Sequence, residues 1–491
     1  MKPNVTSSNR LTIDRRHFLL GTSSIAAAGA LSGCASMLSP SQSLETEYAS
    51  AWKRADAIVA ATKAPLFPAR DFNIVDFGAV GDGKTMNTLA IKKAIAACHA
   101  AGGGRVVIPQ GRFLTGPIHL LSNINLHLVK NATLAFSTNP DDYLPAVFTR
   151  WEGMEHMGYS PLIYAYRQKN LAITGEGTLD GQGDRQTWWP WKGGRWNDGK
   201  NWTVEGVPTQ DEARDKLMRD MENNVPVEQR IYADGAYLRP PFVQPYECEN
   251  IHIQGITIVA APFWLLNPVL CTNVLIQGVT LESLGPNSDG CDPESCKNVV
   301  IEDCFFNTGD DCIAIKSGRN EDGRRIGVPS ENIVIRNCKM RNGHGGVVIG
   351  SEMSGGVRNV FVENCEMSSP HLLRGLRIKT NSVRGGIVEH FYARDVEIGE
   401  TQTAIVIDFQ YEEGDSGKHT PIVRNLDFRN IHCKKAGKVF QVRGYTRSPI
   451  TNFSLINSRF DQVEGIGVLE ELDNFVAKDV FIKGELFRVN S

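Results

Sequence analysis

The sequence repeats one short pattern, an asparagine followed by three apolar residues: Asn273-Val274-Leu275-Ile276, Asn298-Val299-Val300-Ile301, Asn332-Ile333-Val334-Ile335 and Asn359-Val360-Phe361-Val362. Related copies begin at Asn170, Asn250, Asn425, Asn452 and Asn474. The steps from Asn250 are 23, 25, 34 and 27 residues, then 66 for a pair of turns, then 27 and 22. Blades of a propeller would have a more constant length. The pattern therefore predicts an all-β fold, a parallel β-helix whose turns vary in length.

Length and composition agree with one long solenoid. The chain has 491 residues, of which 41% are hydrophobic and 22% charged. A length prior alone would suggest about three domains, but a solenoid grows without splitting into domains. The formal net charge is -3, so no bulk basic field attracts a polyanion, and nucleic acid is not expected as a partner.

The N-terminus, residues 1–34, has the features of a targeting segment. Arg15-Arg16 precedes an apolar run that is too short and mild for a membrane span, and it resembles a twin-arginine export signal. Leu31-Ser32-Gly33-Cys34 resembles a bacterial lipobox. We favour lipid attachment at Cys34 over a cleaved signal with a chance cysteine. The protein is then expected to be exported, to the periplasm or outer membrane, touching a membrane only through this anchor.

Residues 35–70 are predicted to be a linker and a helix. Apolar residues at helical spacing between 44 and 62 form one face of the predicted helix: Tyr48, Ala51, Trp52, Ala55, Ile58 and Val59. In the next segment, 71–116, a glycine-punctuated loop precedes a second helix ending near His99. We reject a phosphate-binding loop because the Gly-Lys-Ser/Thr ending is missing. We expect this helix to cap the open end of the solenoid, so that the β-helix extends over 71–491.

An insertion interrupts the repeats between Asn170 and Asn250, at about 185–237. It holds five of the eight tryptophans: Trp188, Trp189, Trp191, Trp196 and Trp202. Broad indole rings stack well on sugar faces. A local packing cluster that holds the insertion together explains them equally well, so both interpretations stay open.

The cysteines indicate neither a disulfide scaffold nor a zinc site. Cys304, Cys338 and Cys365 each fall six residues after a repeat asparagine, which predicts a buried stack of small apolar side chains. Pairing of Cys291 with Cys296 is possible but nothing supports it. No two Cys-x2-Cys pairs occur, so zinc is not expected.

The repeats bring chemically active residues into register. Asp310 lies 12 residues after Asn298, and His344 lies 12 residues after Asn332. Equal offsets place residues at the same position on successive turns, which stack about 4.8 Å apart. Asp310 and His344 are therefore predicted to be neighbours, with Asp289 one turn away on the other side.

Clustered carboxylates suit cleavage of a glycosidic bond. One acid protonates the leaving oxygen and another activates water, with the carboxyls about 6.5–9.5 Å apart in inverting enzymes. Asp310 and Asp311 are consecutive, and we expect Gly309 to allow a bend that brings both to one cleft. Arg377 and Lys379 alternate onto one face and suit a sugar carboxylate. Each motif alone is weak; together and in register they indicate hydrolysis of an acidic sugar polymer.

These motifs resemble those of glycoside hydrolase family 28, the polygalacturonases. Four elements match in order: Asn287-Ser288-Asp289, Gly309-Asp310-Asp311, Gly343-His344-Gly345 and Arg377-Ile378-Lys379. Ser288 stands where the family has threonine, and the resemblance covers about residues 71–435. It implies a single-stranded right-handed parallel β-helix and hydrolysis with inversion, without metal or other cofactor.

The resemblance also implies residue roles. Asp310 is the general acid, and Asp289 and Asp311 activate water. His344 supports protonation of the acid, and the substrate is bound by Arg377, Lys379, Tyr411 and Asn287.

The expected substrate is polygalacturonate or another pectic polysaccharide. Residues 71–116 and 150–183 resemble exo-acting bacterial members, which release galacturonate or digalacturonate. The alternatives are a hydrolase of branched pectin (rhamnogalacturonan or xylogalacturonan), a calcium-dependent pectate lyase, and a noncatalytic glycan-binding lipoprotein. The sequence leaves the oligomeric state open.

Overall fold

The computed structural model describes residues 40–194 and 201–488. The chain forms two compact units, Met1–Glu47 and Tyr48–Ser491. In the first unit only the beginning of helix α1 (Pro40–Ala61) is described, so the predicted signal segment and Cys34 lie outside the described residues. None of the described helices is both long enough and apolar enough to cross a membrane.

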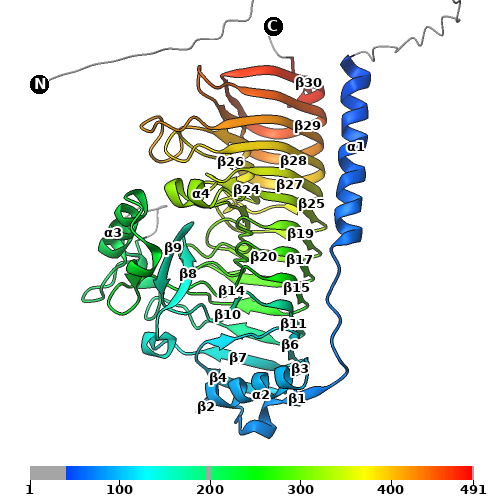
Figure 1. The fold of residues 1–491 in the computed structure, drawn as a ribbon. Coiled ribbons are helices and arrows are strands. Elements are labelled where there is room, and N and C mark those ends of the chain that lie inside the picture. The colour runs from blue at the N-terminus through cyan, green and yellow to red at the C-terminus, as the bar shows by residue number, and fades with distance from the viewer. Residues whose placement is uncertain (1–39, 195–200, 489–491) are drawn as a thin grey trace, which may run out of the picture. The chain divides into compact units, whose positions relative to one another are not determined.

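The second unit contains a parallel β-helix, as predicted, and Figure 1 shows its coils stacked from β1 to β30. One strand of each coil belongs to a first sheet in which every strand pairs parallel with the next. Its strands are β1 (Asp71–Asn73), β3 (Gly104–Ile108), β6 (Ile124–Leu128), β11 (Lys169–Gly175), β15 (Glu249–Gln254), β17 (Thr272–Gln277), β19 (Lys297–Glu302), β22 (Ser330–Arg336), β25 (Val357–Met367), β27 (Ile387–Asp408), β28 (Ile422–Arg443), β29 (Ile450–Glu470) and β30 (Leu472–Ile482).

Two further sheets complete the coils. The second sheet runs through β2 (Asp82–Met86), β4 (Gly111–Thr115), β7 (Ala132–Phe136), β12 (Thr178–Asp180), β16 (Thr257–Val259), β18 (Thr280–Ser283), β20 (Phe305–Thr308) and β23 (Lys339–Met340) to the end of β25. The third sheet runs through β5 (Ile118–His119), β10 (Ile163–Tyr166), β14 (Val243–Tyr246), single bridges at Leu266 and Cys291, β21 (Ile313–Ile315), β24 (Val347–Gly350) and β26 (Arg374–Lys379) to the end of β27. A short β31 (Glu485–Leu486) pairs antiparallel with β30.

The repeated asparagines turn the chain into each coil. Asn273, Asn298 and Asn332 have positive φ angles of 58°, 57° and 60°, a backbone region that asparagine tolerates better than most residues. Each side-chain amide nitrogen also donates a hydrogen bond to the side-chain oxygen of the asparagine one coil earlier. The distance is 3.1 Å from Asn298 to Asn273 and from Asn332 to Asn298. In the coil between Asn359 and Asn425 the position is taken by His390, also at positive φ, which accounts for the double step of 66 residues.

The predicted cysteine stack is confirmed. Cys304, Cys338 and Cys365 are buried on successive coils, and all ten described cysteines are free, including Cys291 and Cys296. A second buried row, Cys248, Cys271 and Cys296, follows the strand ends of the third sheet. Both rows fill the core with small side chains where two sheets meet.

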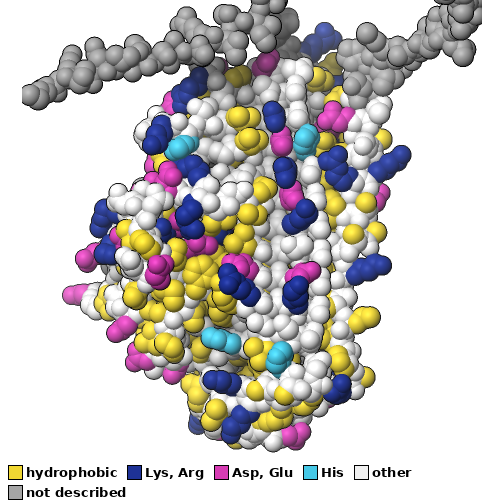
Figure 2. All heavy atoms as spheres, viewed as in Figure 1, with side chains coloured by type: hydrophobic (Ala, Val, Ile, Leu, Met, Phe, Trp, Pro, Cys, Tyr) yellow, Lys and Arg dark blue, Asp and Glu magenta, His cyan; other side chains and the backbone are white. Residues whose placement is uncertain are grey.

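Two helices cover the solenoid. From Tyr48 onward, α1 packs Ala51, Trp52, Ala55 and Ile58 against the outer face of the first sheet, so the predicted apolar face is confirmed. Helix α2 (Thr88–Ala100) buries Ala90, Ile91, Ala94, Ile95 and Cys98 against the first coils, which confirms a capping helix there. Elsewhere on the viewed face, side chains of both charges are interspersed (Figure 2), in keeping with a net charge near zero.

A lobe projects from the third sheet (Figure 1). We define it as residues 147–158, 181–194 and 201–242; it holds β8 (Val147–Trp151), β9 (Met154–Gly158), β13 (Ile231–Tyr232) and α3 (Asp211–Glu222). Its hydrophobic cluster extends into the coils, since Trp151 stacks on Phe263 with ring centroids 5.3 Å apart. The sequence predicted only the later part of this lobe; the hairpin β8–β9 joins it from an earlier coil. Helix α4 (Asn320–Ile326) contacts the lobe through α3 and β9. The remaining short 3-10 helices are η1 (Ile74–Phe77), η2 (Pro140–Tyr143), η3 (Trp189–Lys192) and η4 (Val227–Gln229).

Candidate active site

A cleft of about 660 Å³ lies on the third sheet under the lobe. Its lining includes seven of the eight predicted site residues that the structure describes: Asn287, Asp289, Asp310, His344, Arg377, Lys379 and Tyr411. The eighth, Asp311, is fully buried directly behind them, within ion-pair reach of Lys379. A smaller recess of about 370 Å³ adjoins the cleft at His344 and Leu373, which line both spaces.

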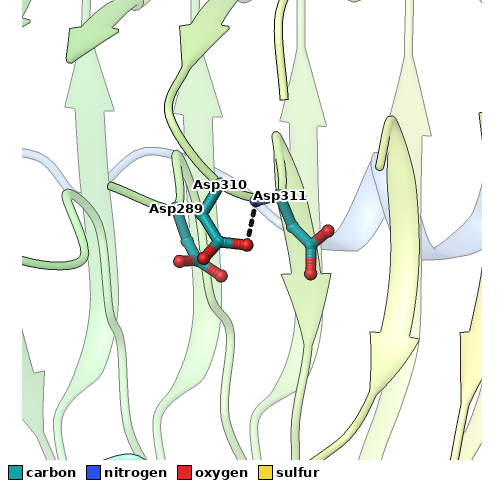
Figure 3. Close-up of side chains that lie close together, drawn as sticks. All are labelled: Asp289, Asp310 and Asp311. Atoms are coloured by element: carbon teal, nitrogen blue, oxygen red, sulfur yellow. Dashed lines mark hydrogen bonds between the residues drawn. The ribbon is translucent and has the colours of Figure 1, made fainter. Parts of the chain in front are cut away.

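The coil register brings the acids together. The backbone amide of Gly290 donates to Asp311 O, and that of His344 donates to Asp310 O, so the three motifs occupy consecutive coils. One oxygen from each of Asp289, Asp310 and Asp311 lies within 4.8 Å of the others, and Figure 3 shows the three carboxyl groups side by side. The predicted neighbours Asp310 and His344 are in contact, with 2.8 Å between Asp310 Oδ1 and His344 Nδ1.

Glycines permit this close stacking. A β-carbon on Gly309 would stand 2.1 Å from Gly285 O, and one on Gly343 would stand 2.5 Å from Asp310 O. The chain bends at Gly309 and Asp310, as expected, although the φ of Gly309 is ordinary; this glycine is needed for the close approach between coils. Gly343, at φ +143°, does need the freedom of glycine.

The carboxyls are not electrostatically equivalent. Burial, with help from the charges of Asp292 and Asp310, raises the pKa of Asp289 well above its usual value. Burial would also raise the pKa of Asp310, but the charge and hydrogen bond of His344 outweigh it and lower that pKa. In the free site burial therefore favours the protonated form of Asp289, whereas His344 favours the ionised form of Asp310 and not the protonated form that we expected.

Asp289 and Asp310 come from adjacent coils, and sheet strands stack about 4.8 Å apart. One oxygen of each acid accordingly lies within 4.8 Å of the others, which is a closest approach and not the separation of whole carboxyl groups, roughly 6.5–9.5 Å in inverting glycosidases. This closest approach does not by itself distinguish inversion from retention.

Basic side chains face the acids. Lys379 Nζ lies 2.7 Å from Asp311 Oδ2, and Arg377 Nη1 lies 3.5 Å from Asp311 Oδ1. Both cations also lie over the ring of Tyr411, at 5.3 and 5.4 Å from its centroid. Burial raises the pKa of the Tyr411 hydroxyl to about 12, so it remains a hydrogen-bond donor at neutral pH. This edge of the cleft can bind a carboxylate.

Asn287 is held from below. Its side-chain oxygen accepts a hydrogen bond of 2.7 Å from Arg239, which is fully buried and also donates to the carbonyls of Pro262 and Pro286. Burial lowers the pKa of Arg239 to about 9. Ser288, the one departure from the family motif, is buried and shares a hydrogen bond of 2.9 Å with Ser283, which keeps it away from the cleft.

Sequence reasoning missed several residues that lie in the cleft or directly behind it. Lys316 lies 3.0 Å from Glu352 and 3.9 Å from Asp289. The coil register could have identified Lys316. Ile315 pairs with Ile349, so Lys316 is level with Gly350, and Gly350 pairs with Lys379. Lys316 therefore occupies the same position as Lys379, two coils earlier. Asp292 lies fully buried three residues after Asp289. Glu152 belongs to the lobe, where the sequence has no repeat pattern from which its place in the cleft could be predicted.

The tryptophans of the insertion serve different purposes. Trp188 is buried against Tyr143, and Trp191 contacts Tyr159 and Tyr237, which fits the packing interpretation. Trp202 lines the cleft. Trp196 lies outside the described residues.

A parallel β-helix with clustered carboxylates and cations in one cleft defines a class of enzymes that cleave acidic polysaccharides. The family model for glycosyl hydrolases family 28 matches residues 233–463. A second model, described as rhamnogalacturonase A/epimerase, pectate lyase-like, matches residues 72–127. The chain is 30% identical over 410 residues to a protein of Vitis vinifera described as a probable polygalacturonase, covering 79% of this chain and 74% of the relative. The chain belongs to glycosyl hydrolases family 28, and it is a glycoside hydrolase.

Two bacterial proteins are also similar. The crystal structure of a hyperthermoactive exopolygalacturonase from Thermotoga maritima superposes with a TM-score of 0.85 at 42% identity, over 89% of this chain and 97% of that one. An exo-poly-alpha-D-galacturonosidase of Dickeya chrysanthemi is 26% identical over 397 residues. That match covers 75% of this chain but only 62% of the relative.

Proposed function

We propose that this enzyme hydrolyses the α-1,4-galacturonosidic bonds of polygalacturonate and removes galacturonate or digalacturonate from the chain end. One observation carries the proposal: Asp289 and Asp310 share a cleft with Arg377 and Lys379, which suit a sugar carboxylate, and Asp311 lies directly behind with one oxygen within 4.8 Å of an oxygen of each. The names of the bacterial relatives support an exo-acting polygalacturonase.

The proposed roles follow from where each group lies. Asp310, paired with His344 at the junction of the cleft and the smaller recess, donates the proton to the leaving oxygen. Asp289 and Asp311 activate the attacking water. Arg377 and Lys379 bind the galacturonate carboxylate, with the ring of Tyr411 against both cations, and Asn287, which also lines the cleft, contacts the substrate.

The lobe supports the exo mode. Trp202, Gln210 and Arg214 of the lobe line the cleft but not the smaller recess, which adjoins the cleft at His344 and Leu373. We propose that the released sugar binds under the lobe and that the remaining chain leaves through the recess.

Product analysis tests this function. Wild type is incubated with polygalacturonate beside Asp310→Asn, and products are followed by chromatography and by NMR of the anomeric proton. We expect saturated mono- or digalacturonate from the first time point, newly formed as the β-anomer, and none from the variant. A ladder of oligomers would overturn the exo mode. Absorbance near 235 nm that EDTA abolishes would instead indicate a lyase, and no product would require trials on branched pectins.

We further propose that the protein is exported and anchored by lipid at Cys34, on the side of the periplasm or outer membrane. The support is the sequence alone, Arg15-Arg16 followed by an apolar run and Leu31-Ser32-Gly33-Cys34. Mass spectrometry of the mature N-terminus tests it. An acylated Cys34, and loss of membrane association in Cys34→Ala, are expected; an unmodified residue after a different cleavage site would refute the anchor.

A further inference from the structure

A second charged cluster lies in the cleft, apart from the three aspartates. Arg319 lies among three carboxylates, at 3.0 Å from Glu152, 3.3 Å from Glu352 and 3.8 Å from Glu412. The four residues come from separate parts of the chain: Glu152 joins β8 to β9 in the lobe, Arg319 precedes α4, Glu352 follows β24, and Glu412 follows β27. All four line the cleft.

With Glu413, which pairs with Arg384 at 3.2 Å, the cluster and its immediate partners comprise four carboxylates and four cations, so the charges balance. Glu152 also pairs with Arg214 at 3.0 Å, Glu352 with Lys316 at 3.0 Å, and Glu412 with Arg384 at 3.2 Å. Each carboxylate therefore has a second cation, in contrast to the cationic edge formed by Arg377 and Lys379. A balanced set of donors and acceptors does not select a charged ligand; it suits neutral hydroxyl groups, which both donate and accept.

The cluster contains a hydrogen-bond donor that no described residue accepts. Arg319 is only 2% exposed, and its Nε has no hydrogen-bond partner among the described residues. Glu152 at φ 45° and Gly153 at φ 80° form the two-residue turn of the hairpin β8–β9, which holds the Glu152 side chain at the tip of that hairpin. An unpaired buried donor such as Arg319 Nε is a cost that commonly accompanies a binding site.

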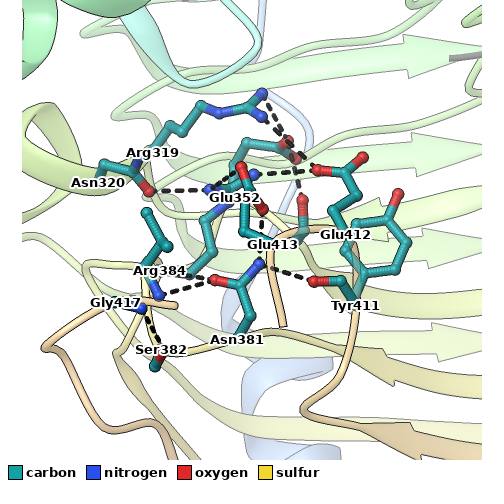
Figure 4. A network of polar contacts seen from close by, with 12 residues as sticks. Arg319, Asn320, Glu352, Asn381, Ser382, Arg384, Tyr411, Glu412, Glu413 and Gly417 are labelled. Carbon is teal, nitrogen blue, oxygen red and sulfur yellow. Dashed lines mark hydrogen bonds and ion pairs between the residues drawn. The ribbon is translucent and has the colours of Figure 1, made fainter. Parts of the chain in front are cut away.

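The cluster is also rigidly supported (Figure 4). Arg384 is fully buried and pairs with Glu412, Glu413 and the side-chain oxygen of Asn320. Asn381 donates to Tyr411 O and to Glu413. The loop that carries Glu412 and Tyr411 is thereby fixed in place, as a preorganised binding wall requires.

We propose that Glu152, Arg319 and Glu412 bind the hydroxyl groups of the galacturonate at the non-reducing end, including its O4. In the interior of the polymer O4 is engaged in the next glycosidic bond, so a site that requires a free O4 hydroxyl recognises a chain end. This inference rests on the proposed function, and it assigns end recognition to hydrogen bonds in addition to the bulk of the lobe.

Two trisaccharides separate the possibilities. Trigalacturonate has a free O4 hydroxyl at its non-reducing end, whereas the 4,5-unsaturated trimer lacks that hydroxyl and keeps all three carboxylates. We expect wild type to favour the saturated trimer by on the order of 100-fold in kcat/KM, because its buried polar groups would otherwise remain unpaired. The double bond also alters intrinsic reactivity, so the decisive quantity is how this ratio changes in variants.

Glu152→Gln and Glu412→Gln should each reduce the ratio by about tenfold, by slowing hydrolysis of the saturated trimer more than that of the unsaturated one. Glu331→Gln is the matched control. Glu331 also pairs with two cations, Lys297 and Arg358, but lies on the first sheet outside the cleft, so the ratio should not change. Thermal melting of each variant shows whether it is folded. The side chain of Glu412 is more exposed than that of Glu152 and does not belong to the lobe, so Glu412→Gln should disturb the packing of the lobe less than Glu152→Gln.

The outcomes are distinguishable. If both trimers are hydrolysed and the ratio is the same in wild type and the two cleft variants, the hydroxyl site is refuted while the proposed function stands. If neither trimer nor polygalacturonate is hydrolysed, the proposed function itself fails. A lower ratio in both cleft variants with an unchanged control supports the inference.

Discussion

The asparagine ladder and the aspartate cluster are both rows of polar side chains on successive coils, yet they are built in opposite ways. In the ladder each amide has its partner, such as Asn332 on Asn298 at 3.1 Å. In the cluster, Asp289 Oδ1 and Asp311 Oδ1 have no hydrogen-bond partner among the residues that the structure describes. Fully paired polar groups stabilise a fold, whereas crowded carboxylates that keep oxygens without a hydrogen bond cost stability and gain reactivity. Mutations in the two rows should therefore have opposite consequences.

The largest effect is expected from Asp310→Asn. The amide cannot deliver a proton to the leaving oxygen, so kcat on polygalacturonate should fall by roughly 10³-fold or more. The free energy of unfolding should fall only modestly, because asparagine keeps the shape of Asp310 but loses the ion pair with His344 that lowers the pKa of Asp310 in the folded protein. Steady-state rates beside a thermal melt measure both. Activity within tenfold of wild type would remove Asp310 from the role of general acid.

Asn298→Ala should show the reverse pattern. It removes the hydrogen bonds with Asn273 and Asn332 and places alanine at φ 57°, so the free energy of unfolding should fall by about 2 kcal/mol. Below the melting transition kcat/KM should stay at the wild-type value. Asn298→Gly, which has no penalty at positive φ, should lose less and so separates backbone strain from lost hydrogen bonds. A large loss of activity in folded Asn298→Ala would contradict the division between ladder and cluster.

The same contrast explains what could be predicted from the sequence. The period of the repeats fixed the ladder, and equal offsets from Asn298 and Asn332 placed Asp310 against His344. Lys316 obeys that register and could have been found. Glu152 could not, because the lobe folds back over the coils through a path that has no period. Sequence periodicity determines neighbours within a solenoid, but side chains that reach a cleft from an insertion depend on packing such as that of Trp151 on Phe263.

A smaller effect, of opposite sign to the ladder variant, is expected for Asp289→Asn. Because its pKa is raised in the folded protein, ionised Asp289 destabilises the fold at pH values above the ordinary aspartate range. The neutral amide should add about 1 kcal/mol to the free energy of unfolding at pH 7, while activity is largely lost. Chemical denaturation at several pH values measures it. The gain should shrink as the pH falls and wild-type Asp289 takes up its proton; a gain that persists at pH 3 would point to another cause.

The smallest effect is expected from changing a residue that lies next to the aspartate cluster but outside the cleft. Asp292 is fully buried, does not line the cleft, and has no hydrogen-bond partner for either carboxylate oxygen within the described part of the chain. Its charge helps to raise the pKa of Asp289, after burial itself. In Asp292→Asn that charge is gone, so the pKa of Asp289 should fall and the proposed base should ionise at lower pH. The acidic limb of the profile of kcat/KM against pH should then move to lower pH. At a pH on this limb kcat/KM should rise by only a few-fold, and at the pH of maximal activity it should change little. Glu331→Gln, remote from the cleft, should leave the limb in place. A limb that stays fixed, or that moves to higher pH, in Asp292→Asn would mean that Asp289 is not the group whose ionisation limits the reaction.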